Sequence, residues 1–89
     1  MEWEALVCQT AAGAGVSPEE ARTVLNALFD TLGEAMQRER LILLRPDLGH
    51  FEMQERPSAA GTVRRVPVFR ESGTLRARLR EQDEPEKAD

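Results

Sequence analysis

The stretch VPVFR, residues 66–70, decides the fold that this sequence predicts. It ends an alternating segment, residues 62–69, in which Val66 and Val68 share one face while Arg65 and Pro67 share the other. A period of two is typical of a strand. The chain then enters a short third helix that starts at Ser72-Gly73 and carries Leu75 and Leu79. A strand leading directly into a helix is therefore predicted near the carboxyl end.

Two more strands are predicted upstream of this segment. Residues 50–55 alternate, with Phe51 and Met53 on one side, and residues 57–61 form the turn that follows. The apolar run of residues 41–44 predicts a short strand covered on both faces, although a helix end would have the same pattern. Residues 46–49, Pro-Asp-Leu-Gly, have turn chemistry. The three strands form an antiparallel meander.

Two helices are predicted before the strands. One of them spans residues 17–38, because Ser17 is a good N-cap, Pro18 suits the first helical position and Glu20 completes a capping box. Its apolar residues follow the 3.6 period for four turns. An earlier helix is expected over residues 2–12, with Gly13 and Gly15 ending it.

The 89 residues are expected to form one α+β domain, residues 1–81, followed by an acidic tail, residues 82–89, that we expect to be disordered. The chain has three Phe, one Trp and no Tyr, so its own core is thin, and a dimer interface would supplement it. The start of the sequence is acidic and no membrane-length apolar run occurs, which predicts a cytoplasmic protein. Cys8 is the only cysteine, which excludes an internal disulfide.

The positive charge is concentrated in one segment, although the net charge is −4. Residues 1–60 carry a net charge of −5, residues 61–80 carry +5 and residues 81–89 carry −4. Because electrostatic fields fall off over about 8 Å at physiological salt, the basic segment is a candidate phosphate-binding surface. The alternative is an ordinary solvated surface of mixed charge. Residues 81–89 could also compete with a bound polyanion for the nearby arginines.

The sequence contains no motif for catalysis. No phosphate loop, paired metal-ligand spacing or nucleophile elbow occurs, so no catalytic residue, metal, cofactor or small-molecule substrate is expected. His50 is interpreted as a polar strand residue, and Cys8 as a small apolar filler. We therefore expect that the protein is not an enzyme.

Three stretches resemble the HU and integration host factor family of bacterial histone-like proteins. Residues 14–21 followed by LFDTL at 28–32 are similar to the family's first helix-turn-helix. Residues 47–52, DLGHFE, resemble its Gly-Phe-Gly-x-Phe turn. The most specific match is residues 66–70 with Leu75-Arg76, which resembles the segment that enters the last helix. The resemblance covers residues 1 to about 80.

The resemblance implies an intertwined dimer, either a homodimer or a heterodimer with an HU-like homologue. Phe29, Phe51 and Phe69 occupy family core positions, so they are expected in the dimer core. The family's long minor-groove arm is shortened here, since residues 51–69 leave about seven residues per strand, a reach of roughly 23 Å. Its proline-bearing tip has no counterpart, and Pro57 does not substitute for it. Weak or no DNA bending is therefore expected.

The resemblance also implies where DNA would bind. The preferred hypothesis is sequence-independent binding of duplex DNA in the nucleoid, through arginines that would contact phosphates: Arg56, Arg64, Arg65, Arg70 and Arg76. Two alternatives remain open. One is a structural or protein-interaction module that kept the fold and lost DNA binding. The other is a subunit that pairs with a full-length homologue to complete its set of arms.

Overall fold

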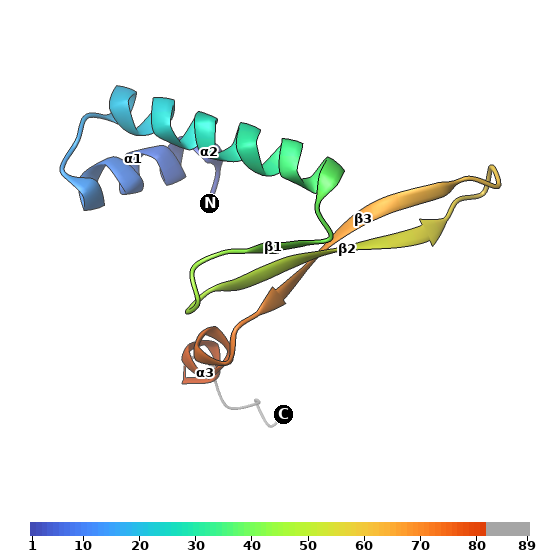
Figure 1. Ribbon diagram of the computed structural model, residues 1–89. Helices are drawn as coiled ribbons and strands as arrows, with labels where there is room; N and C mark the ends of the chain where they lie inside the picture. The colour runs from blue at the N-terminus through green and yellow to red at the C-terminus, as the bar shows by residue number, and fades with distance from the viewer. Residues whose placement is uncertain (82–89) are drawn as a thin grey trace, which may run out of the picture. The chain divides into compact units, whose positions relative to one another are not determined.

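Three helices and a three-stranded antiparallel sheet make up residues 1–81, the part of the chain that the computed structural model describes (Figure 1). Along the chain they are α1 (Trp3–Ala14), α2 (Pro18–Arg38), β1 (Leu41–Leu43), β2 (Gly49–Pro57), β3 (Val63–Glu71) and α3 (Gly73–Glu81). This order and the α+β class confirm the prediction. The predicted tail, residues 82–89, lies outside the described residues. The chain comprises two compact units, residues 1–35 and the residues from Met36 onward.

Local hydrogen bonds and backbone conformation explain where α1 ends and where α2 begins. Gly15 terminates α1 in the left-handed conformation, with φ of 71°, and its amide donates to the carbonyl of Ala11. The expectation that Gly13 helps to end this helix was wrong, because Gly13 lies inside α1 and its φ is not positive. At the start of α2 the capping box is reciprocal. The Ser17 hydroxyl accepts from the Glu20 amide and the Glu20 carboxylate accepts from the Ser17 amide, each at 3.1 Å.

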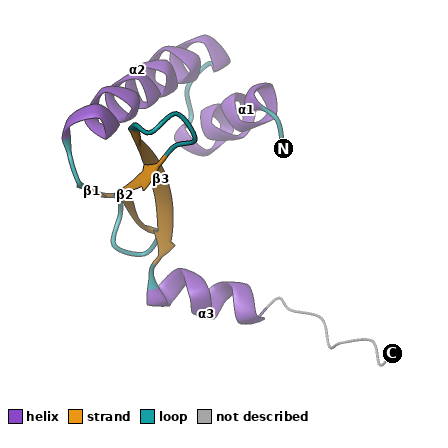
Figure 2. Ribbon diagram, turned by 90° about the vertical axis from the view of Figure 1, so that its right-hand side faces the viewer, coloured by secondary structure: helices purple, strands orange, loops and turns teal. Residues whose placement is uncertain are grey.

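The helical unit has a small core. α1 and α2 lie side by side, and Val7, Ala11 and Ala21 are buried between them, with Leu25 packed against this cluster (Figures 1 and 2). The rings of Trp3 and Phe29 meet edge to face with centroids 5.6 Å apart. The rest of the apolar stripe on α2 is largely uncovered: Val24 is 67% exposed, and Leu28 and Phe29 are about half exposed.

The sheet has the order β1-β2-β3, and β2 and β3 extend well beyond β1. β1 pairs only with residues 50–52, whereas β2 and β3 pair from Gly49↔Glu71 to Pro57↔Val63. From Phe51↔Phe69 to the tip each strand contributes seven residues, the number that the sequence predicts. The expectation that β1 is covered on both faces does not hold for the single chain. Leu43 is 73% exposed and Leu41 is 50% exposed.

Gly49 marks the tightest backbone approach in the sheet. It has φ of 144°, and a Cβ atom at this position would lie 2.1 Å from the carbonyl oxygen of Arg70. The preceding turn is held by a two-pronged ion pair, in which Arg45 donates to both carboxylate oxygens of Asp47 at 3.0 and 2.6 Å. Asp47 consequently has a pKa below its ordinary value, chiefly because of its hydrogen bond to Arg45. The predicted turn at residues 46–49 is thus confirmed, with a steric requirement for glycine.

α3 begins directly after β3, as predicted. The Ser72 hydroxyl accepts from the amide of Leu75 at 2.9 Å, which identifies Ser72 as the N-cap residue. Among the described residues, no helix has both the length and the apolar character needed to span a membrane.

Candidate nucleic-acid interface

Most of the arginines on the β2–β3 ribbon gather on one face of it. Residues paired directly opposite in antiparallel strands point to the same side of the sheet, and this side changes with each residue. The register therefore places three of the five predicted phosphate-binding arginines together, on a surface that we name the arginine face: His50, Glu52, Gln54, Arg56, Arg64, Val66, Val68 and Arg70. Arg56, Arg64 and Arg70 are all exposed.

Two of these arginines form a pair near the tip of the ribbon. Arg56 on β2 is directly opposite Arg64 on β3. The Arg56 guanidinium donates to the side-chain oxygen of Gln54 at 2.7 Å, which orients it along the arginine face. Two like charges opposite each other are unfavourable in the isolated protein, and an anion placed between them removes the repulsion.

The third arginine lies nearer the root of the ribbon, beside a carboxylate. The Nε of Arg70 is 3.2 Å from one oxygen of Glu52, and the Nε2 of His50 is 3.4 Å from the other. His50 and Arg70 are themselves directly opposite in the register. The hydrogen bond from His50, followed by that from Arg70, lowers the pKa of Glu52 below its ordinary value. The arginine face thus has an acidic residue at its root.

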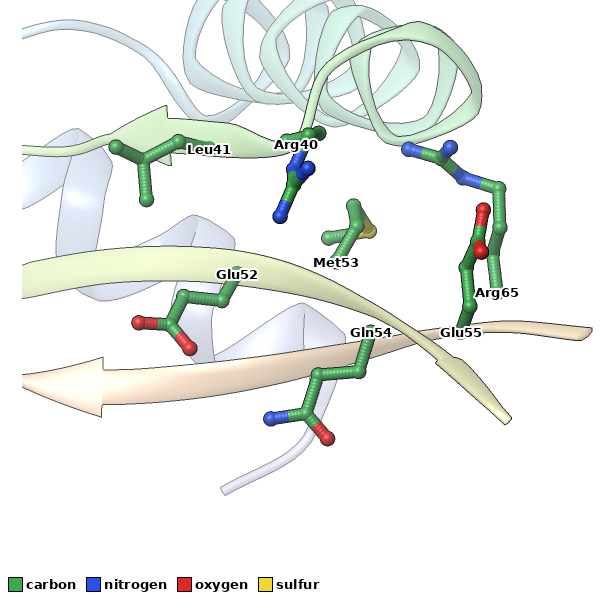
Figure 3. Close-up of a pocket in the computed structure, with 7 residues that line it drawn as sticks. All are labelled: Arg40, Leu41, Glu52, Met53, Gln54, Glu55 and Arg65. Atoms are coloured by element: carbon green, nitrogen blue, oxygen red, sulfur yellow. The ribbon is translucent and has the colours of Figure 1, made fainter.

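Arg65 lies on the opposite face and is already hydrogen-bonded to backbone. Its guanidinium donates to the carbonyl of Glu39 at 2.6 Å and to that of Met36 at 3.2 Å. These carbonyls belong to the end of α2 and the residue after it, where helix carbonyls lack partners within the helix. In Figure 3 the Arg65 side chain reaches toward the helix end, while Glu52 and Gln54 point away from it on the other side of β2.

An open groove of about 820 Å³ lies along the edge of β2 that β1 leaves unpaired, next to Leu41 at the start of β1. Its lining combines two arginines, two carboxylates and uncharged side chains: Arg40, Leu41, Glu52, Met53, Gln54, Glu55 and Arg65 (Figure 3). Residues of both sheet faces line it, so it is the edge of the ribbon and not a closed chamber. Within residues 1–81 no group of three or more His, Cys, Asp or Glu side chains is placed to hold a metal ion.

The fifth predicted arginine, Arg76, is on α3 and not on the ribbon. Its Nε donates to the carboxylate of Glu71 at 3.1 Å, and the side chain is 59% exposed. Two further arginines, Arg78 and Arg80, lie in the last turn of α3. α3 is therefore a second basic element, separate from the arginine face.

The three phenylalanines are not enclosed within the single chain. Phe51 and Phe69 face each other on β2 and β3, with ring centroids 5.6 Å apart at an angle of 63°. Phe69 is nevertheless 42% exposed and Phe29 45% exposed. Because large aromatic side chains contribute most when fully buried, these faces are incomplete without a further covering surface.

The sequence prediction did not include the contacts of Glu52 with His50 and Arg70. His50 was correctly expected to be a polar strand residue, and it lies in β2. The signal for the cluster was present, since period-two alternation from His50 through Glu52 and Gln54 to Arg56 places all four on one face. The cross-strand partner, Arg70, requires the register of β3.

Comparisons with known proteins support the fold. No protein-family model matches the chain, and no curated protein matches it. Among solved structures, the chain is similar to a point variant of HU from Thermotoga maritima, with a TM-score of 0.74 and 23% sequence identity over 89% of this chain and 99% of that one. The chain therefore has an HU-like α+β fold, as the three sequence stretches indicated.

Proposed function

We propose that this protein binds duplex DNA without sequence specificity, as a dimer. The observation that carries the proposal is the arginine face, where Arg56, Arg64 and Arg70 from two strands share one side of a projecting ribbon. Guanidinium groups bind phosphate oxygens in a forked geometry, and a ribbon of this width fits a DNA groove. The HU-like fold is consistent with this use. The described residues contain no recognition helix that we would assign to base reading.

The five arginines contribute in different ways. Arg56, Arg64 and Arg70 are the proposed phosphate contacts of the ribbon, and Arg76 is a further one on α3. Arg65, with its guanidinium on the carbonyls of Met36 and Glu39, ties β3 to the end of α2 one residue from Arg64. It supports phosphate binding by positioning the other arginines.

The dimer completes the apolar faces that one chain leaves open. Val24, Leu28 and Phe29 on α2, and Phe69 on the sheet, are each at least 42% exposed in the single chain. Burying such side chains contributes roughly 25 cal/mol of favourable free energy per Å² of apolar surface, which favours association. Phe29, Phe51 and Phe69 are the proposed centre of this shared core. A homodimer is the simplest assembly, and an HU-like homologue could replace one protomer.

The shortened arm argues against strong bending of DNA. Insertion between base pairs needs an apolar wedge at the tip of an arm. Here the tip is a five-residue loop, 58–62, and Pro57 is the last residue of β2, not the loop apex. We infer weak or no bending, action in the cytoplasm at the nucleoid, and no catalytic activity.

Two observations favour a second candidate, a structural or protein-interaction module. Glu52 is placed within hydrogen-bonding range of Arg70 on the proposed DNA surface, and the whole chain carries a net charge of −4. If these charges outweigh the arginines, the fold serves protein partners and not DNA.

A salt titration separates the two candidates. Labelled duplex and four-way-junction DNA are titrated with full-length protein at several salt concentrations. If each protomer of a dimer neutralises about three phosphates, log Kd plotted against log salt has a slope of magnitude near 5, at about 0.9 per phosphate. The absence of binding to either DNA at low salt would exclude the proposed function and favour the interaction module.

A further inference from the structure

Glu52 is the one carboxylate on the arginine face, and it lies between the two basic groups at its root. One oxygen faces Arg70 at 3.2 Å and the other faces His50 at 3.4 Å. The Glu52 side chain is 37% exposed and that of Arg70 is 53% exposed, so both are open to an approaching ligand. A DNA phosphate that approaches the Nε of Arg70 would therefore meet this carboxylate.

We propose that Glu52 is a built-in counter-ion that weakens DNA binding at the root of the ribbon, and that protonation of His50 relieves it. This inference rests on the proposed function and adds regulation to the same surface. Glu52 acts on a phosphate in two ways. It competes for the donors of Arg70, and its own charge repels the phosphate.

The groups around His50 determine how its protonation affects Glu52 and Arg70. Glu52 faces it from the same strand and Arg70 from the opposite position on β3, while its β1 partner, Leu43, is uncharged. A protonated His50 donates to Glu52 with a full positive charge, which draws the carboxylate away from Arg70. It also adds one positive charge to the arginine face. Both effects favour a polyanion.

The chain is well suited to testing this inference, because His50 is its only histidine. Histidine is the side chain that ordinarily changes charge between about pH 5 and pH 8, with the α-amino group as the other titrating group in this range. A pH response of DNA binding in that range can therefore be assigned to His50 by one substitution.

The first experiment compares Glu52→Gln with Glu55→Gln in the full-length protein. Both substitutions remove one negative charge from β2, but Glu55 is paired with Arg65 on the opposite face. With a labelled duplex at low salt, Glu52→Gln is expected to tighten binding about threefold to tenfold, as expected for one charge a few ångströms from a phosphate. Glu55→Gln is expected to change it less than about twofold. Equal effects of the two variants, or no effect of Glu52→Gln, would overturn the proposal.

The second experiment measures affinity from about pH 8 to about pH 5.5 at constant ionic strength. The wild-type protein should bind more tightly as the pH falls, and His50→Gln should remove most of this response. A pH response that His50→Gln leaves intact would overturn the role of His50. Thermal melts confirm that each variant is folded. If neither wild type nor Glu52→Gln binds DNA, the proposed function itself fails. If wild type binds and Glu52→Gln matches it, only the counter-ion role fails.

Discussion

Arg56 and Arg64 lie directly opposite each other near the tip of the β2–β3 ribbon. A pair of like charges at this spacing costs up to about 1 kcal/mol of stability in a sheet. Such a pair is unfavourable for the free protein and favourable for a protein that holds an anion. The ribbon tip is therefore where we expect the largest contribution to DNA binding.

Replacing both tip arginines by glutamine should weaken DNA binding without harming the fold. The double variant Arg56→Gln, Arg64→Gln removes four charges from a dimer, so the magnitude of the salt slope should fall from near 5 to roughly 2. The melting temperature should stay constant or rise, because the repulsion is gone. Arg45→Gln is a useful control, since Arg45 is engaged by Asp47 in the turn before β2. An unchanged slope in the double variant would contradict the assignment of these two arginines.

Arg65→Met should affect stability more than the salt slope. The substitution removes both hydrogen bonds to the carbonyls of Met36 and Glu39, at a cost of about 1 kcal/mol per bond. Urea unfolding measures this cost. Arg64→Met, one residue earlier and on the arginine face, should lower the stability much less. If Arg65→Met instead lowers the salt slope as much as Arg64→Met does, Arg65 contacts phosphate directly.

Two glycine substitutions should have opposite effects. Gly49→Ala places a methyl group 2.1 Å from the carbonyl of Arg70 at a positive φ, so it should destabilise the protein by about 2 kcal/mol or more. Gly33→Ala lies in the interior of α2 with no atom near the new methyl group, and should stabilise by up to about 1 kcal/mol. Thermal melts of both variants, at one protein concentration, provide the comparison. A tolerated Gly49→Ala would contradict the close approach of β2 and β3 at this position.

Val24→Asp tests the dimer. Val24 is 67% exposed in the single chain, so a charge there would be buried only in the interface of the proposed dimer. Sedimentation should show dissociation of the variant at concentrations where the wild type is dimeric. Asn26→Asp adds the same charge to an exposed position of α2 and should leave the dimer intact. A wild-type protein that sediments as a monomer at all concentrations would exclude the shared core.

Acid should destabilise the protein partly through Glu52. The pKa of this carboxyl is lowered by His50 and Arg70, so its contribution to stability is complete above the ordinary carboxyl pKa and is lost as the pH falls through the lowered one. Asp47 behaves in the same way because of Arg45. Melting temperatures measured between about pH 5 and pH 3 should fall less steeply for Glu52→Gln than for wild type. Parallel curves would show that the Glu52 contacts contribute nothing to the folded state.

Local signals predicted the helices, and non-local pairing decided the site. Ser17, Pro18 and Glu20 lie next to one another in sequence, so the start of α2 could be predicted to the residue. Whether Gly13 continues a helix or ends it depends on which of two nearby glycines takes the left-handed conformation, and composition does not distinguish them.

The arginines show the same limit. The alternation of side chains along a strand already places Arg64 and Arg65 on opposite faces. The prediction of five phosphate-binding arginines did not take this separation into account. Arg65 donates to the carbonyl of Glu39, the residue after α2, and the two residues are 26 positions apart in the sequence. Such contacts follow from the register of the strands and cannot be read from the segment that contains the arginine.

The scarcity of buried side chains has a consequence for how the protein reaches its working form. Among the described residues, the buried hydrophobic side chains are Val7, Ala11, Ala21 and Met53. If the protein is the dimer proposed above, folding and the association of two chains are coupled in a single bimolecular event. The refolding rate should then rise with chain concentration, and the amount of protein synthesised, more than any property of one chain, would set the fraction that is folded.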